Sequence, residues 1–374
     1  MATARTRRLR WSAPVLVAAV IGMIVAVPGL SAADSPTLPR LTPAQLISKA
    51  QQAKISAFSG TVNLSTNLGI PNLSALAGAA GGGGQSFSPT DLLSGAHQAR
   101  VWFASPDSAR VALFLDMAEV DVVHHGQDIW TWDSTSKKVV HYTVAAETGP
   151  AGTSAKAAAP DPTEAVKTPQ QVADDLLAHI DPTTKATVGA SVRVAGQAAY
   201  QLVLTPRAGV STVDHVVITI DSVTGMPLEV QTFAKGQKAA AVDLGFSHID
   251  YSKPAASRFT FTPPPGSTLT TKALGGSHTS APTADTKPAA ASATDTSQPT
   301  MVGQDWATVA LFHNVQIPKQ VADFLKAASP VSGSFGSGRL IQTSLVNVLV
   351  LDDGRVAVGA VTVGALEAAV ASAH

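Results

Sequence analysis

The stretch "DVVHHGQDIWTWDSTSKKVVHY", residues 121–142, contains three short strand-forming runs separated by two turn-forming segments. The runs are rich in valine, isoleucine, tryptophan and tyrosine, whose branched or aromatic side chains favour extended backbone. The segments between them, "HGQD" and "DSTSKK", have the length of hairpin loops. Loops this short join antiparallel neighbours, because a parallel pair needs a long crossover. The stretch therefore predicts consecutive antiparallel strands in one sheet.

The same pattern extends over most of the chain. Further short runs of this kind are "SGTVNLST", "ARVWFA", "ARVALFL", "YQLVLTP", "DHVVITID", "PLEVQTF" and "FTFTP". No regular alternation of strand and helix is present, so a doubly wound parallel sheet is not expected. The sequence predicts an α+β fold dominated by antiparallel strands.

Two segments carry helix start signals. In the first, Thr42 is a suitable N-cap, Pro43 suits the first helical position and Gln45 completes a capping box. The second, "TPQQVADDLLAHIDP" at residues 168–182, repeats the same arrangement. Its apolar stripe is formed by Val172, Leu176, Leu177 and Ile180.

The N-terminus has the layout of an export signal. Four arginines within the first ten residues precede the apolar run "VLVAAVIGMIVAV", and the small residues Ser31 and Ala33 follow. This order predicts a signal peptide over residues 1–33, cleaved after Ala33. An uncleaved N-terminal anchor is the alternative, because flanking residues extend the run toward the ~20 residues of a membrane span. Either form places the rest of the chain outside the cytoplasm, in the periplasm or cell envelope or secreted.

Composition excludes several kinds of site. The chain has no cysteine, which rules out disulfides, thiol catalysis, thiolate metal sites and a lipid-modified cysteine. Without the four N-terminal arginines, 22 basic groups remain against 26 acidic ones, a net of −4. Nucleic-acid binding is not expected, because it normally needs a clustered basic patch.

The histidines of the opening stretch do not form a predicted metal site. His124 and His125 are adjacent, so on a strand their side chains project to opposite faces. They cannot then bind one ion together, and no metal or cofactor is expected.

No catalytic constellation is predicted either. Residues 134–137 match a Ser-x-x-Lys motif, but they lie in an expected hairpin turn and no Lys-Thr-Gly partner follows. The carboxylates are scattered, and no pair of them is singled out by its spacing. The sequence does not support an enzyme.

Trp130 and Trp132 are the most informative side chains of the opening stretch. Because they are two residues apart, both rings are expected on the same face of one strand. Val140 and Tyr142 are expected to continue that surface on the next strand, opposite the helical stripe of Val172, Leu176 and Leu177. Either an ordinary hydrophobic core or the wall of an apolar cavity fits this pattern.

"SRFTFTPPPGSTL", residues 257–269, resembles the closing strand of the LolA-like carriers, which move lipoproteins across the bacterial periplasm. Other segments also resemble parts of these carriers and follow one another in a similar order along the chain. They are "FSGTV", "VWFASP", "VVHHGQDIWTWD", "TPQQVADDLL", "YQLVLTP" and "VVITIDSVTGMPLEV". The resemblance covers about residues 41–270. It implies a curved antiparallel half-barrel with a helical lid and an apolar cavity for acyl chains, a fold shared by LppX-like and RseB-like proteins.

The resemblance favours a cavity wall that contains Trp130, Trp132, Val140, Tyr142, Val172, Leu176 and Leu177. One departure concerns the outer-membrane carriers, which place a lid-latching arginine just before the proline of the "VWFASP" strand. This chain has Ser105 there, so the resemblance does not extend to the latch.

The chain is expected to contain the signal or anchor at 1–33, a half-barrel domain at 41–270, a linker at 271–300 and a small αβ unit at 301–374. Such a protein would carry or bind lipid or lipoprotein acyl chains outside the cytoplasm without catalysis. The linker and the extra unit motivate the alternative, an RseB-like envelope-stress regulator that binds a membrane protein partner.

The segment 271–300 is rich in alanine, threonine, serine and proline and has almost no large apolar side chains. Such a segment cannot offset an ordering entropy of ~1–2 kcal/mol per residue. Limited proteolysis is therefore expected to cut there first and to give two resistant fragments on a denaturing gel. Protection of the segment would contradict the prediction.

Overall fold

The computed structural model describes residues 35–69, 92–93, 95–115, 117–144, 168–178, 183–274, 299–315, 317, 325–326 and 328–373. The expected signal segment, most of the expected linker, and residues 321–324 of the expected αβ unit lie outside this part. The side chain of Leu176 also lies outside it.

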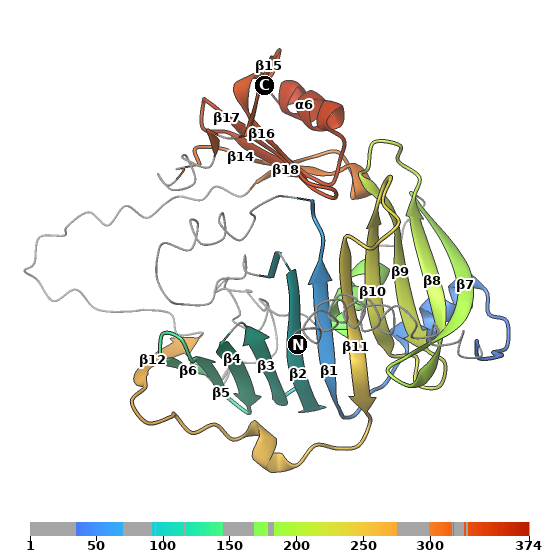
Figure 1. Ribbon diagram of the computed structural model, residues 1–374, viewed down its shortest axis with the longest axis vertical. Helices are drawn as coiled ribbons and strands as arrows, with labels where there is room; N and C mark the ends of the chain where they lie inside the picture. The colour runs from blue at the N-terminus through green and yellow to red at the C-terminus, as the bar shows by residue number, and fades with distance from the viewer. Residues whose placement is uncertain are drawn as a thin grey trace, which may run out of the picture.

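In the described part of the chain, twelve strands form one large sheet (Figure 1). The strands are β1 (Phe58–Thr66), β2 (Gly95–Ser105), β3 (Ser108–Leu115), β4 (Ala118–His125), β5 (Asp128–Asp133), β6 (Lys138–Val144), β7 (Thr184–Val194), β8 (Gln197–Pro206), β9 (Val213–Asp221), β10 (Pro227–Ala234), β11 (Val242–Asp250) and β12 (Thr268–Leu274). Their order is β12-β6-β5-β4-β3-β2-β1-β11-β10-β9-β8-β7, so β12 and β7 form the two edges and the sheet stays open.

Two helices, α2 (Pro43–Gln51) and α4 (Pro169–Ala178), pack on one face of β7–β11. Their capping boxes form as expected. The Thr42 N–H donates to Gln45 Oε1 at 2.9 Å, and the Thr168 N–H donates to Gln171 Oε1 at 2.8 Å. The core between the helices and the sheet includes Leu46, Ala173, Leu177, Leu202, Ile218 and Val230. We call the face that carries α2 and α4 the helix side, and the opposite face the outer side.

Residues 251–267 connect β11 to β12, and we call this segment the strap. It contains a short 3₁₀ helix, η2 (Ala256–Phe259), that contacts β3 and β4. The strap is long enough for β12 to join β6 in parallel, with Thr268 paired to Lys138. The prediction of a strand at "FTFTP" is wrong. Phe259 belongs to η2, and after β11 the next strand begins only at Thr268. Three prolines at 263–265 lack the N–H groups that a sheet ladder needs.

A second, six-stranded sheet is built from the C-terminal residues. It contains β13 (Thr300–Val302), β14 (Val309–Phe312), β15 (Ser329–Gly333), β16 (Gly336–Gln342), β17 (Asn347–Leu351) and β18 (Val356–Gly359) in the order β13-β14-β18-β17-β16-β15. A 3₁₀ helix, η3 (Asp305–Ala307), precedes β14. One face of this sheet is covered by α6 (Val363–Ser372), which buries Leu366 and Val370 in the second core (Figure 1).

The C-terminal unit is docked onto the large sheet. The Thr212 N–H donates to the Ala360 carbonyl at 3.0 Å, and the Thr362 N–H donates to the Val210 carbonyl at 2.7 Å. Leu345, from the loop before β17, is buried in the core that surrounds α2 and α4. Further hydrogen bonds across the junction join Ser344 to Leu68 and Trp306 to Thr184. The two sheets therefore share part of one apolar core.

The expected fold class, a LolA-like curved half-barrel with helices plus a small αβ unit, is confirmed by this open sheet, its helix side and the second sheet. The large sheet continues to Leu274, four residues into the range expected for the linker. None of the helices in the described part of the chain is long and apolar enough to cross a membrane.

Leu345→Ala is expected to lower the free energy of unfolding by about 2–5 kcal/mol, because it removes a buried side chain from a core that both sheets contact. Chemical denaturation followed by circular dichroism measures the change. Met301→Ala, at a side chain that is 61% exposed, is the control and should change stability by less than about 0.5 kcal/mol. Loss of the C-terminal unit alone, with an unshifted transition for the rest, would contradict the shared core.

Candidate functional site

A row of directly paired side chains crosses five neighbouring strands, and we call it the valine row. Its members, from β2 to β6, are Val101, Val111, Val122, Thr131 and Val140, each paired with the next. Residues directly opposite each other in an antiparallel pair project to the same face. The row is therefore a continuous, nearly apolar band across half of the large sheet.

The strand register places this band on the helix side. Val230 of β10 lies in the core beneath the helices and pairs with Leu244, which pairs with Leu64 of β1. Leu64 pairs in turn with His97, which shares its face of β2 with Val101 because the two are four residues apart. The valine row thus faces the same side as α2 and α4.

Two further rows flank the valine row on the same face. One consists of Ala99, Leu113, Val120, Asp133 and Lys138, and the other of Phe103, Ala109, His124, Ile129 and Tyr142. The surface is thus apolar over β2–β4 except at His124, and the first row ends in the charged residues Asp133 and Lys138 on β5 and β6.

The helices mainly cover the other half of the sheet. Their core is built from β7–β11, together with residues of the C-terminal unit. Val101 is buried, while Val111, Val122, Thr131 and Val140 are each partly exposed. Aliphatic side chains that remain partly exposed on an inner face are what an apolar ligand would cover.

The tryptophans lie on the outer side, away from the valine row. Trp130 pairs with His141 and Trp132 pairs with Val139, whereas Val140 and Tyr142 pair with Thr131 and Ile129. The expected continuous surface of the tryptophans with Val140 and Tyr142 is therefore wrong. The loop between β5 and β6 sets a register that puts odd-numbered residues of β6 beside even-numbered residues of β5.

Trp130 helps to hold the strap against the outer side. Its ring stacks on His141 with centroids 3.8 Å apart and planes at 4°, and lies 5.5 Å from the Phe261 ring of the strap. His141 Nε2 is 2.6 Å from Asp128 Oδ1, which fixes the imidazole in this position. The aromatic pattern in the sequence therefore marks a packing site for the strap.

An ion pair between the partly exposed Arg110 and the buried Asp121 was not anticipated from the sequence. Arg110 donates from Nε to Asp121 Oδ1 at 3.0 Å and from Nη2 to Oδ2 at 2.6 Å. The Arg110 and Arg258 guanidiniums each lie 5.5 Å from the Trp102 ring, and Arg110 Nη1 also donates to the Arg258 carbonyl. Burial raises the pKa of Asp121, and the bonds from Arg110 oppose that rise. Alternation of polar and apolar residues places Asp121 on a face but does not reveal its partner.

Two of the helical residues named from the sequence, Val172 and Leu177, lie in the closed core. Leu177 is buried there, and Val172 packs against it. They share the helix side with Val140 and Tyr142, so the structure groups these four residues on one side and separates them from the tryptophans. Phe103, Val111 and Leu113, which sequence reasoning missed, belong to the same surface. The alternation of apolar and polar residues along β2 and β3 is visible in the sequence. It does not show which face of the large sheet these three side chains occupy.

The two adjacent histidines project to opposite faces, as the strand geometry requires. His125 Nδ1 lies 3.2 Å from the Phe259 carbonyl on the outer side, and His124 Nε2 lies 2.9 Å from the Gly126 carbonyl. Among the residues that the structure describes, no three His, Asp or Glu side chains are placed to hold a metal ion. Ser105, at the position of the carriers' arginine, ends β2 and pairs with Ser108.

Arg110→Met is expected to lower the free energy of unfolding by about 3 kcal/mol, because it leaves the buried Asp121 carboxylate without its cation. The loss should shrink as the pH falls through the raised pKa of Asp121, since a protonated carboxyl needs no counter-ion. Urea titrations at neutral and acidic pH measure both effects. Arg193→Met, at an exposed position of β7, is the control, and equal losses in the two variants would contradict this role.

Comparison with protein-family models and with curated proteins gave no match. Among solved structures, the chain is similar to the Pseudomonas aeruginosa MucA/MucB complex, at 16% identity and a TM-score of 0.43, over 88% of this chain and 96% of that one. It is similar to an uncharacterized conserved protein from Thermus thermophilus, at 9% identity and a TM-score of 0.32, over 61% and 98%. A LolA superfamily protein from Nitrosomonas europaea matches at 10% identity and a TM-score of 0.23, over 59% and 99%. At these identities the likenesses concern the fold alone.

Proposed function

We propose that this protein is a non-catalytic, extracytoplasmic binding protein for the acyl chains of a lipid or lipoprotein. The binding surface is the helix side of β2–β6, centred on the valine row. The observation that carries the proposal is that Val111, Val122 and Val140 stay partly exposed on the helix side of an open sheet.

The valine row has the chemistry that such a ligand needs. An acyl chain laid across it would remove apolar surface from water at ~0.8 kcal/mol per buried methylene. Ten methylenes would supply about 8 kcal/mol before the cost of association, which is enough for useful binding without a charged contact. Asp133 and Lys138, at the end of the adjoining row, lie where a polar head would emerge.

The proposed location rests on the N-terminal sequence. The basic residues, apolar run and small residues of positions 1–33 form an export signal or anchor. A protein without cysteine also needs no particular redox environment to fold. The periplasm or cell envelope fits both features.

A second candidate function is an envelope regulator that binds a membrane protein. The docked C-terminal unit favours it, because Leu345 and the bonds at Thr212 and Thr362 join a further surface rigidly to the half-barrel. Carriage of an acyl chain alone does not need that surface. The similar MucB structures include complexes of that protein with MucA. The partner that we propose for this chain is an envelope membrane protein.

Val122→Asn and Val140→Asn are each expected to weaken binding of a fluorescent fatty-acyl probe about tenfold, because burying an amide against an alkyl chain costs roughly 1–3 kcal/mol. Thr143→Asn is the matched control, since Thr143 lies on β6 but projects to the outer side. Probe titration measures binding, and circular dichroism checks that each variant is folded. Equal affinity in all three folded variants would remove the valine row as the site.

Native mass spectrometry of protein purified from its own host separates the two candidate functions. Copurified lipid, lost in the Val140→Asn variant, supports acyl-chain binding. A stoichiometric membrane protein without lipid supports the regulator instead.

A further inference from the structure

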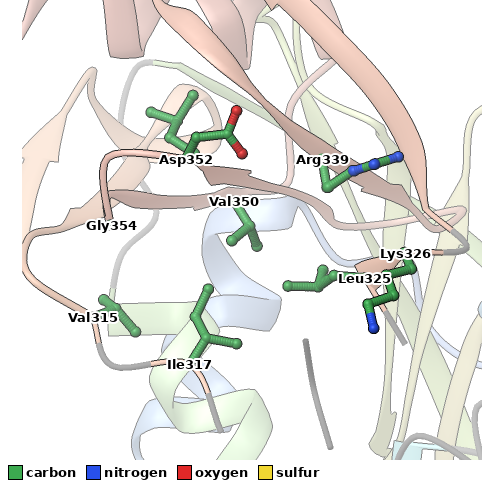
Figure 2. Close-up of a pocket in the computed structure, with 9 residues that line it drawn as sticks. Val315, Ile317, Leu325, Lys326, Arg339, Val350, Asp352 and Gly354 are labelled. Atoms are coloured by element: carbon green, nitrogen blue, oxygen red, sulfur yellow. The ribbon is translucent and has the colours of Figure 1, made fainter. Parts of the chain in front are cut away.

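A pocket of about 350 Å³ lies in the C-terminal unit (Figure 2), and none of its lining residues belongs to the valine row. It is lined by Val315, Ile317, Leu325 and Val350, with Lys326, Arg339 and Asp352 among the remaining lining residues. In Figure 2 the side chains of Ile317, Leu325 and Val350 point toward one another, and Asp352 lies apart from Arg339 and Lys326. The volume is at the lower end of the ~300–1,000 Å³ that small-molecule pockets span.

The alternation of β17 explains why the pocket lies on this face of the second sheet. Leu349 and Leu351 belong to the core under α6, so Val350 between them projects to the opposite face. Arg339 of β16 is directly paired with Val350, which places its side chain beside that valine. The α6 face is therefore closed by apolar packing, while the opposite face combines aliphatic and charged groups.

Two contacts of the described residues frame the pocket. The Val315 N–H donates to the Gly354 carbonyl at 2.9 Å, which fixes one wall to the turn between β17 and β18. Arg339 Nη1 donates to the Ala328 carbonyl at 3.2 Å, which holds the guanidinium near the other wall.

The charge at this pocket favours an anionic group. A guanidinium has five N–H donors, and the contact with Ala328 uses one of them. Within the part of the chain that the structure describes, Arg339 has no carboxylate partner. The lining also contains one further basic side chain, Lys326, against one acidic side chain, Asp352.

We propose that this pocket binds a short alkyl carboxylate, with the aliphatic chain among Ile317, Leu325 and Val350 and the carboxylate on Arg339. Arginine suits this role because its planar fork of donors matches the two oxygens of a carboxylate. The site is separate from the valine row, so its test does not depend on the proposed function.

Isothermal titration of the full chain with octanoate tests the site. Val350→Trp fills the pocket and is expected to abolish octanoate binding. Arg339→Gln is expected to weaken it about tenfold, through loss of a charge-assisted bond, without changing the affinity for octanol. Arg193→Gln is the control for loss of an exposed arginine elsewhere, and circular dichroism checks folding.

The outcomes separate this site from the valine row. Loss of octanoate binding in Val350→Trp, with unchanged binding of the long-chain probe, supports the proposal. Octanoate binding that survives both Val350→Trp and Arg339→Gln but falls in Val140→Asn would overturn it and assign the ligand to the valine row. Tighter binding of octylammonium than of octanoate would also overturn it, because Asp352 would then select the head group. If Val350→Trp does not fold, unchanged octanoate affinity in Arg339→Gln is sufficient to reject the site.

Discussion

The pairing of β5 with β6 is the constraint on which the two faces of the large sheet depend. Thr131 opposite Val140 continues the valine row, and Trp130 opposite His141 builds the stack that receives the strap. Side chains alternate along a strand, so a slip of β6 by one residue would move Val140 to the outer side and His141 to the helix side. The valine row would then end at Thr131, and Trp130 would lose its stacking partner. One register thus determines both the candidate binding surface and the packing of the connection to β12.

Local signals were sufficient to predict much of the architecture. Short turn segments predicted the antiparallel meander, and the Thr-Pro-x-Gln pattern predicted the capped start of both helices. These features depend on residues within a few positions of each other. The faces of β5 and β6 could not be predicted in the same way, because loop length and hydrophobicity fit either register when both faces contain apolar residues. Trp130 and Val140 are both large and apolar, so pattern alone did not separate them.

The other contacts that the sequence did not predict join residues that are far apart along the chain. Arg110 and Asp121 could be placed on strands, but the bond from Arg110 to the Arg258 carbonyl requires the strap to return across the outer side. Leu345 similarly reads as part of the C-terminal unit, and only the three-dimensional structure shows that it completes the core around α2 and α4. Contacts of this kind explain why a polar-looking strap and a compact-looking tail are both integral to the half-barrel.

The pairing of β1 with β11 has a consequence for how the chain acquires its structure. The bond from Ser247 to Thr61 joins residues 186 positions apart, near the centre of the sheet. Contacts this distant close slowly, because the intervening loop must first lose its entropy. A chain that emerges from a translocation channel N-terminus first would expose β1–β6 as a meander with an unpaired central edge until β11 arrives. During that interval the edge and the valine row are open to aggregation, which makes a holding chaperone valuable at this stage.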